Sequence, residues 1–328
     1  MKPLGGLGGL SRLAEALSSR DPEAVVEAFK EVNDLESTIE LFKEANNMRE
    51  ENLGNSFKII GHQADVSPCS IYPPCKFCSL SSSIKEYREG KITVPLEEIV
   101  INSRYMVERG ATVLLYGGGI SPLSGKIAAE IAESVSRELK AEIVFNVGPV
   151  EEEFVDRLKN LGVKRFVLSL ETTDKELFKD ARPGDSFEKK IEFIKLLERK
   201  GVGVSVILMN GVGSEEDLVR SIASLRSFRN LVGIRISTFN PVPGTPWESK
   251  QRASFLTTLK ACAFARLLFP KAQIDLAAGT PEGALPLSIM AGCGNEIVGL
   301  IMGKKRVVDR TEAIKVELAK AGMKLILP

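Results

Sequence analysis

The 328-residue sequence has a single histidine, His62, no long apolar run and almost no net charge. Lys plus Arg (44) nearly balances Asp plus Glu (43), so no global field favours nucleic acid or an acidic membrane surface. No stretch approaches the roughly 18 apolar residues of a membrane span. Residues 1–10 are apolar but interrupted by glycines and soon followed by Arg12 and Glu15, which makes a poor secretory signal. We therefore expect a cytoplasmic protein that binds neither nucleic acid nor membrane.

Cysteine is also scarce, but its five copies are unevenly placed. Cys69, Cys75 and Cys78 form a Cys-x5-Cys-x2-Cys cluster within ten positions. Three prolines within residues 68–74 keep this segment out of helix and strand. An odd, clustered set of cysteines argues against a disulfide framework and for a reducing compartment. Three thiolates on one loop predict a metal site.

The number of ligands indicates which metal this loop holds. A structural zinc site is closed by four protein ligands, and His62 lies seven residues before Cys69. An iron–sulfur cube can be held by three thiolates if a small molecule takes the fourth iron. We favour the cube. A zinc site completed by His62 or by a partner chain is the alternative, whereas uncoordinated thiols in such a cluster would be readily oxidised.

The cysteine loop resembles the cluster loop of the radical S-adenosylmethionine (SAM) superfamily. The resemblance lies in three cysteines ending in Cys-x2-Cys, with the aromatic Phe77 before the last one, after a predicted strand. It implies a [4Fe-4S] cluster on Cys69, Cys75 and Cys78, whose fourth iron binds the amino and carboxylate groups of SAM. The commonest spacing in the superfamily has three residues between the first two cysteines. This chain has five residues there, which restricts the subfamilies that it can resemble.

The hydrophobic pattern predicts a (β/α) barrel with an N-terminal helical extension over residues 1–54. Residues 11–53 read as helices, and residues 57–64 as a strand leading into the cysteine loop. Further strands are expected at 112–116, 142–147, 164–170, 203–209, 231–237 and 272–277, with helices at 95–110, 123–138, 150–161, within 174–200, 214–227, 250–268, and after 281 and 309. About eight such units favour a complete or nearly complete TIM-type barrel over residues 55–328. A doubly wound open sheet is the alternative.

In such a barrel the functional groups lie at the C-terminal ends of the strands, and two strand ends match superfamily motifs. Gly117 and Gly118 correspond to the Gly-Gly-Glu motif, whose backbone holds the SAM amino group; the third residue here is Gly119. Glu171 and Arg182 match positions that contact the SAM ribose or amino group and the SAM carboxylate, and a guanidinium suits a carboxylate. Alternatively, the glycines form only a turn, Glu171 caps a helix and Arg182 is a surface residue.

Two later strand ends complete the predicted pocket. Met209, Asn210 and Gly211 resemble the superfamily segment that stacks on the adenine of SAM. Phe239 and Asn240 precede a Pro-x-x-Gly-Thr-Pro segment and would line the substrate side of the pocket. Asn146 and Asp275 also point toward the mouth, although an ordinary strand terminus is the better interpretation for both. Cys262 and Cys293 are interpreted as a buried thiol and a loop residue.

The resemblance implies reductive cleavage of SAM to a 5′-deoxyadenosyl radical, which abstracts hydrogen from a small-molecule substrate. A one-electron donor of the ferredoxin or flavodoxin type is then required. The five-residue gap best fits HmdB-like proteins, relatives of biotin synthase and of the maturase HydE, which are implicated in making the iron-guanylylpyridinol cofactor of [Fe]-hydrogenase.

Two alternatives stay open. One is an archaeal lipoyl-synthase-like or other biotin-synthase-related sulfur-insertion enzyme with a second cluster on a partner subunit, because Val144–Asn146 and Val204–Val206 carry no cysteine. The other is a non-catalytic metal scaffold, whose only support is the missing acidic residue after Gly118.

Overall fold

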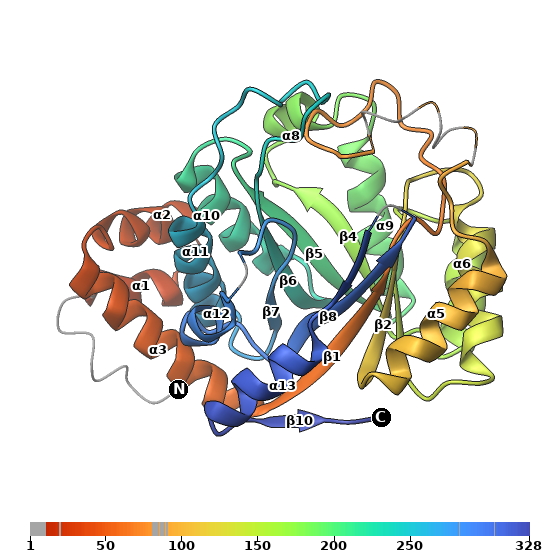
Figure 1. Cartoon of the computed structure of the whole chain (residues 1–328). Helices are drawn as coiled ribbons and strands as arrows, with labels where there is room; N and C mark the ends of the chain where they lie inside the picture. Colours follow the sequence, from red (N-terminus) through yellow and green to blue (C-terminus); the bar gives the residue numbers. More distant parts are fainter. Residues whose placement is uncertain are drawn as a thin grey trace.

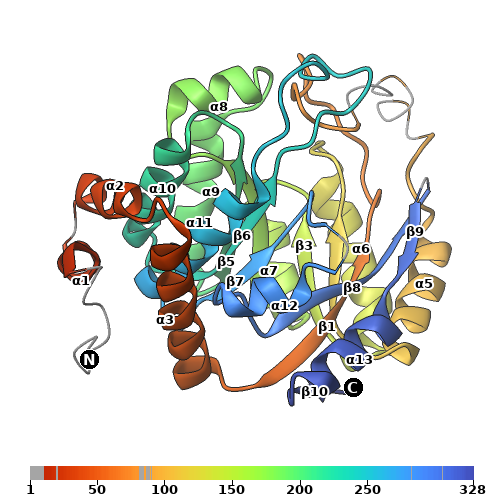
Figure 2. The same cartoon turned by 60° about the vertical axis from the view of Figure 1, so that its left-hand side comes forward.

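Eight parallel strands form the centre of the molecule. In the computed structural model, which describes residues 11–19, 21–80, 85, 89, 91–281, 283–304 and 306–328, these strands curve around a common interior (Figures 1 and 2). They are β1 (Ser56–Gln63), β2 (Ala111–Gly117), β3 (Glu142–Asn146), β4 (Arg165–Glu171), β5 (Gly203–Asn210), β6 (Leu231–Thr238), β7 (Gln273–Leu276) and β8 (Glu296–Gly303).

The strand order identifies the architecture as a barrel. Neighbouring strands follow the order β7-β6-β5-β4-β3-β2-β1-β8, so β1 lies between β2 and the last parallel strand. In a doubly wound sheet the order of the strands reverses partway across the sheet. The order from β7 to β1 shows no such reversal, so the doubly wound alternative is wrong. Within the described residues no ladder joins β7 to β8. The Gly294 N–H, just before β8, donates to the Ile274 carbonyl of β7 at 3.0 Å across this seam.

Three strands near the C-terminus were not assigned from the sequence. Besides β8, these are β9 (Arg306–Asp309), which is antiparallel to β8, and β10 (Lys324–Ile326), which is parallel to β1. The sequence of β8, Glu-Ile-Val-Gly-Leu-Ile-Met-Gly, has no alternation of apolar and polar residues. A strand of a parallel sheet is covered on both faces, so this uniform character fits its position but gives no period-2 signal.

Helices surround the strands on the outside. They are α5 (Leu96–Glu108), α6 (Ser124–Ser136), α7 (Glu152–Asn160), α8 (Lys175–Ala181), α9 (Phe187–Arg199), α10 (Glu215–Ser224) with the 3-10 turn η2 (Leu225–Ser227), α11 (Phe255–Leu268), α12 (Leu285–Met290) and α13 (Thr311–Lys320). Asp174, Ser186, Ser214 and Ser254 cap the first turns of α8 to α11 by accepting a backbone N–H. The predicted helix positions are confirmed.

Apolar side chains fill both sides of the barrel wall. Between the strands and the helices, the rings of Tyr116, Phe145, Phe166 and Phe193 form a chain with centroid separations of 5.4, 6.5 and 5.5 Å. Inside the barrel, a smaller cluster contains Ile60, Val113, Leu115, Val144 and Val167. The barrel interior is therefore packed at this level and is not a pore.

The N-terminal residues form α1 (Ser11–Ser18), α2 (Pro22–Glu31) and α3 (Leu35–Leu53), which pack beside α10 and α11 (Figure 2). Asp21 accepts the Glu23 N–H at 3.0 Å and caps α2, as the Asp-Pro pair predicts. The Phe29 and Phe264 rings meet edge to face at 5.2 Å. Among the described residues, no helix combines the length and the apolar character needed to cross a bilayer.

Candidate metal centre at the mouth of the barrel

The three clustered cysteines lie on the loop that follows β1, at the C-terminal ends of the parallel strands (Figures 1 and 2). This loop is held first by the segment after β2. The Gly119 N–H donates to the Ser67 carbonyl at 2.9 Å, and the Ser67 Oγ donates to the Gly119 carbonyl at 2.6 Å. Further along, the Ser70 N–H donates to the Ile120 carbonyl at 2.8 Å. The cysteine loop and the glycine segment therefore form one unit.

The three glycines are required by this close approach. A Cβ atom at Gly119 would lie 2.4 Å from the Cβ of Cys69, and a Cβ at Gly118 would lie 2.4 Å from the Oγ of Ser67. At Gly117, the nearest atom would be the Nε2 of His62 at 2.5 Å. Real Cβ atoms do not approach other atoms so closely, so the missing side chains of Gly118 and Gly119 make room for the cysteine loop, and that of Gly117 makes room for His62 of β1.

Part of the backbone of these glycines is already hydrogen-bonded. The Gly117 carbonyl accepts the Val66 N–H at 3.1 Å, and the Gly118 N–H donates to the Asn146 carbonyl at 3.1 Å. Within the described part of the chain, no donor reaches the Gly118 carbonyl. This carbonyl is the backbone acceptor that remains for a ligand at the predicted position.

Two other loops hold the far side of the cysteine loop. The Lys76 N–H donates to the Ala181 carbonyl at 2.9 Å, and the Lys76 carbonyl accepts the Trp247 N–H at 3.0 Å. A Cβ at Gly184 would lie 2.3 Å from the Pro73 carbonyl oxygen. The segments after β2, β4 and β6 thus enclose the cysteines, although the strands that precede them are far apart in sequence.

The local environment opposes free thiolates. Cys75 is buried and Cys69 and Cys78 are partly buried, and all three are free cysteines. Burial raises the pKa of Cys75 above its ordinary value and that of Cys78 to about 12. A bound metal ion deprotonates coordinating thiols outright. Coordination to a metal ion would offset the cost of ionising Cys75 and Cys78.

The arrangement of potential ligands disfavours a single zinc ion. Among the described residues, no three His, Cys, Asp or Glu side chains are grouped as ligands of one metal ion. His62 lies on β1 with its ring against Gly117, on the barrel side. Among the described residues, His62 is therefore not grouped with the three cysteines as the fourth ligand of a zinc ion.

Glu171 ends β4 in an unusual conformation next to the cysteines. Its φ is +65°, in the left-handed region, at a register shift between β4 and β5, which costs a non-glycine residue about 1–2 kcal/mol. The carboxylate is 4% exposed, and its Oε1 accepts from the Nη1 of Arg182 at 2.7 Å. The buried Oε2 has no hydrogen-bond partner among the described residues. Burial raises the pKa of Glu171, although Arg182 acts in the opposite direction.

Asp185 and Lys190 extend this pair into a buried network that sequence reasoning missed. The Nε of Arg182 donates to the Oδ2 of Asp185 at 2.8 Å, and the Nζ of Lys190 lies 3.2 Å from the same oxygen. Lys190 is fully buried on α9, and burial lowers its pKa to about 8. A signal for Asp185 exists in the sequence Arg182-Pro-Gly-Asp, where an acidic residue follows the arginine by three positions.

The network limits what Arg182 can offer to a ligand. Burial alone would lower its pKa, but Cys75 and the Glu171 carboxylate outweigh that effect and raise it. Its Nε, Nη1 and Nη2 each contact a carboxylate of Glu171 or Asp185. One N–H remains on each terminal nitrogen, because each Nη carries two hydrogens.

Phe77 and Met209 meet in an apolar cluster on the opposite side of the loop. Met209 is in a buried cluster with Ala181, Val212 and Phe239, against which Phe77 and Trp247 pack. The Trp247 ring lies 6.0 Å from Phe77 and 5.7 Å from Phe239, measured between centroids. Trp247 was not selected from the sequence, where it follows the Gly-Thr-Pro turn without any motif of its own.

Asn210 and Gly211 have structural contacts. The Nδ2 of Asn210 donates to the Ser254 carbonyl at 2.8 Å and to the Oγ1 of Thr258 at 3.0 Å, at the start of α11. Gly211 has φ +107°, and a Cβ there would lie 2.6 Å from the Cβ of Phe239. Asn210 therefore positions the loop with its amide nitrogen, whereas Gly211 permits close packing beside the apolar cluster.

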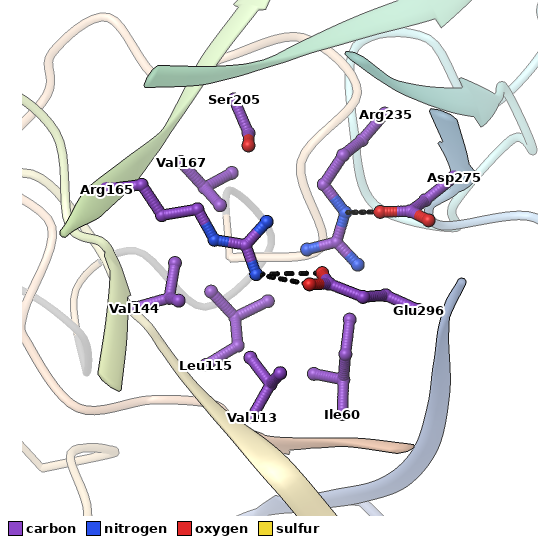
Figure 3. Close-up of a pocket in the computed structure, with 10 residues that line it drawn as sticks. All are labelled: Ile60, Val113, Leu115, Val144, Arg165, Val167, Ser205, Arg235, Asp275 and Glu296. Atoms are coloured by element: carbon purple, nitrogen blue, oxygen red, sulfur yellow. Dashed lines mark hydrogen bonds and ion pairs between the residues drawn. The ribbon is translucent and has the colours of Figure 1, made fainter. Parts of the chain in front are cut away.

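The remaining candidates separate into two regions. The Oδ1 of Asn146 lies 3.4 Å from the Oγ of Ser169 at the end of β4. Asp275 instead lies in a cavity inside the barrel, with its Oδ2 3.8 Å from the Nε of Arg235 (Figure 3). Cys262 and Cys293 are both buried in the main core, so Cys293 is also a core residue.

Comparison with known proteins agrees with this geometry. Residues 69–225 match the Radical SAM superfamily. The matched segment begins at Cys69, spans the three cysteines, and includes Glu171, Arg182 and the β5 loop. Residues 69–225 are therefore similar to the radical SAM superfamily, as the resemblance predicts.

Two of the relatives belong to the predicted group of proteins related to biotin synthase and HydE. The [FeFe] hydrogenase maturase subunit HydE of Thermotoga maritima is 27% identical over 68% of this chain and 64% of its own length. A biotin synthase of Persephonella marina is 25% identical over 62% of each chain. This chain thus spans less than two thirds of the length of either relative. The crystal structure of methylornithine synthase (PylB) superposes with a TM-score of 0.80 at 21% identity, over 96% of this chain and 97% of the other, which confirms the barrel fold.

Proposed function

We propose that this protein is a radical SAM enzyme in which Cys69, Cys75 and Cys78 hold a [4Fe-4S] cluster that binds SAM at its fourth iron. The observation that carries the proposal is the enclosed three-cysteine loop at the mouth of the barrel, inside the segment that matches the superfamily. When bound and reduced by one electron, the cluster and SAM supply a 5′-deoxyadenosyl radical that abstracts hydrogen from a small substrate.

The polar groups beside the cysteines fit the amino acid end of SAM. Among the described residues, the Oε2 of Glu171 is buried without a hydrogen-bond partner, and no donor reaches the Gly118 carbonyl. An ammonium group donates three hydrogen bonds and would satisfy both acceptors. The two N–H groups that remain on Arg182 would donate to the carboxylate, while Asp185, itself paired with Lys190, holds the guanidinium in place.

The apolar groups fit the adenine end. Phe77, Met209 and Gly211 adjoin one buried cluster that Trp247 and Phe239 complete. A flat aromatic base can pack there, since a glycine backbone and a thioether offer smooth, polarizable contacts. The same cluster excludes water from one side of the cysteine loop, which the reactive chemistry requires.

We further propose a role in cofactor biosynthesis of the HmdB type, with an electron donor of the ferredoxin or flavodoxin class in a reducing, cytoplasmic compartment. The Cys-x5-Cys spacing and the likeness to HydE support it. The sulfur-insertion alternative, with a second cluster on a partner subunit, is supported by the likeness to biotin synthase and by the lack of cysteine at the inward positions Val144, Asn146 and Ser205. We take residues 1–54 as an extension of the barrel region 55–328.

An anaerobic reconstitution tests the proposal. After addition of iron and sulfide, iron and sulfide are counted per chain, and 5′-deoxyadenosine is measured after SAM and dithionite are added. Roughly four irons, lost in a triple Cys69/Cys75/Cys78→Ala variant, together with deoxyadenosine release, are expected. A tightly bound zinc, or a cube that never cleaves SAM, would leave a metal-binding scaffold as the function.

A further inference from the structure

We propose that Cys262 and Cys293 form an oxidisable dithiol in the core, which hydrogen peroxide converts into an intramolecular disulfide with the help of Arg266. The pair lies outside the mouth of the barrel, and the proposed function does not use it. The inference therefore rests on this buried cluster alone.

The two cysteines come from neighbouring parts of the barrel wall. Cys262 lies in α11 and Cys293 in the segment between α12 and β8, and α11, α12 and α3 pack against one another (Figure 1). Arg266 follows Cys262 by one helical turn, and its Nε donates to the carbonyl of Gly292, the residue before Cys293, at 2.8 Å. A Cβ at Gly292 would lie 2.9 Å from the Cγ of Arg266. The backbone before β8 thus lies against the face of α11 that carries Cys262.

The two thiols are enclosed together in the apolar core. Both cysteines are free; Cys262 is fully buried, and Cys293 is 5% exposed. Burial and a hydrogen bond with the Cys293 thiol raise the pKa of Cys262 well above its ordinary value. A disulfide needs two sulfur atoms that can approach to about 2 Å, and two hydrogen-bonded thiols are a short displacement from that arrangement. A small oxidant reaches Cys293 first, because only this thiol belongs to a residue with exposed surface.

Arg266 is a fully buried cation that, within the described part of the chain, pairs with no carboxylate. Its Nε and Nη1 donate only to backbone carbonyls, those of Gly292, Pro270 and Ala272, and its Nη2 has no hydrogen-bond partner among the described residues. Burial lowers its pKa to about 10, and the charge of Arg49 acts in the same direction. A buried charge is costly unless it is paired, so this guanidinium stabilises an anion that forms beside it.

The acids around Arg266 leave Cys293 as the group that it activates. The charge of an ionised Cys293 acts on Arg266 more strongly than that of Asp275 or Cys262. Burial raises the pKa of Asp275 to about 8, so much of this carboxyl group is neutral near pH 7. A thiol beside a guanidinium is in the environment that favours a reactive thiolate. Cys293 is therefore the sulfur that attacks the oxidant, and the protonated Cys262 is the sulfur that resolves the product.

The oxidation consumes one molecule of hydrogen peroxide and releases two of water. The Cys293 thiolate attacks one peroxide oxygen, the O–O bond breaks, and the leaving hydroxide takes up the proton that the thiol released. The Cys262 sulfur then attacks the resulting sulfenic acid, so the S–S bond forms and the S–O bond breaks, and the Cys262 proton leaves with the hydroxyl group as the second water. Two electrons pass from the sulfur atoms to the peroxide. The disulfide joins α11 to the segment that precedes β8.

The triple Cys69/Cys75/Cys78→Ala variant isolates this pair, because Cys262 and Cys293 are the two cysteines that remain in the full chain. The folded protein is treated with hydrogen peroxide, the remaining thiols are blocked with N-ethylmaleimide after denaturation, and the intact mass is measured. We expect both thiols to disappear together, with the loss of two hydrogen atoms from a monomer and full recovery after dithiothreitol. Two thiols that remain open to N-ethylmaleimide, a sulfinic acid in place of the disulfide, or disulfides only between chains would overturn the proposal.

Single substitutions in this background assign the three roles. With Cys262→Ser, the sulfenic acid on Cys293 should persist and be trapped by dimedone, whereas with Cys293→Ser the Cys262 thiol should stay reduced. Arg266→Gln should slow the oxidation by about tenfold or more, Arg266→Lys should retain much of the rate, and the exposed Arg199→Gln on α9 should leave it unchanged. An unchanged rate in Arg266→Gln would refute the role of Arg266.

Two further measurements separate this chemistry from exposure of the thiols by unfolding. Below the unfolding transition, the rate of oxidation should not depend on the urea concentration, and a rate that follows the unfolded fraction would overturn the inference. The oxidised protein should unfold at a temperature about 5 °C higher than the reduced protein, because the disulfide restricts the unfolded chain; an equal or lower temperature would show that the native fold does not accommodate the bond. None of these measurements involves the cluster or SAM, so failure of the proposed function leaves them unaffected.

Discussion

Substitution of Gly119 by alanine tests whether the glycines serve the cysteine loop. The new Cβ would lie 2.4 Å from the Cβ of Cys69 and 2.5 Å from its Cα and N atoms. Ordinary contacts begin at 3.4 Å, so the two segments would have to separate by about 1 Å, and two of the three atoms that must move belong to the backbone. Overpacking of this kind costs about 1–3 kcal/mol.

We expect Gly119→Ala to lower the free energy of unfolding of the metal-free protein by about 2 kcal/mol and to bind markedly less iron than the wild type. Both are measured anaerobically, by urea unfolding and by iron and sulfide analysis after reconstitution. Gly201→Ala is the matched control, because Gly201 has φ +65° and no atom within 4 Å of the added carbon. It should cost about 1–2 kcal/mol through backbone strain and leave iron binding unchanged. Equal iron content in Gly119→Ala and the wild type would refute the reasoning.

Three further predictions follow from the site. Glu171→Gln should weaken SAM binding by about tenfold or more without loss of iron, measured by equilibrium dialysis; unchanged affinity would show that Oε2 is not a SAM ligand. The pKa of His62 is lowered to about 4 in the folded state. As the pH falls, the imidazole is therefore protonated in the unfolded chain before it is protonated in the folded protein. The free energy of unfolding should be unaffected by His62 above about pH 6.5 and should fall by up to about 3 kcal/mol toward pH 4. His62→Gln should remove this component, and an NMR titration of the only histidine that gives a pKa near 6.5 would contradict the lowered pKa. Cluster assembly should quench the fluorescence of Trp247, the single tryptophan, because its ring is 6.0 Å from Phe77 in the cysteine loop, whereas the triple cysteine variant should show no change.

Local sequence patterns were sufficient for most of the barrel. Seven parallel strands and the helices between them follow from apolar periodicity, because this signal lies within one element. β8 could not be identified in this way, since its residues are apolar on both faces and Gly299 interrupts the run. The seam between β7 and β8 depends on a contact between Gly294 and Ile274, which has no signature in the sequence.

The candidate site likewise combines residues that a local sequence pattern predicts with residues that only the folded structure brings together. Cys69, Cys75 and Cys78 are close in sequence, so their cluster is visible without a structure. The network around Glu171 is only partly visible, because Asp185 follows Arg182 closely but Lys190 comes from the next helix. Arg235 had no signal at all, since an arginine within a strand gives no indication that, among the described residues, its buried Nε lacks a hydrogen-bond partner. Such an absence is a property of the folded interior.

The ion pair between Arg165 and Glu296 contributes to the way in which the strands of the barrel are held together. Arg165 begins β4 and Glu296 begins β8, so this ion pair joins strands on well-separated parts of the wall through the interior. β8 also borders β7, with which the described residues form no ladder. Two strands of the barrel are therefore linked by a charge pair across its interior and not only by hydrogen bonds around its wall.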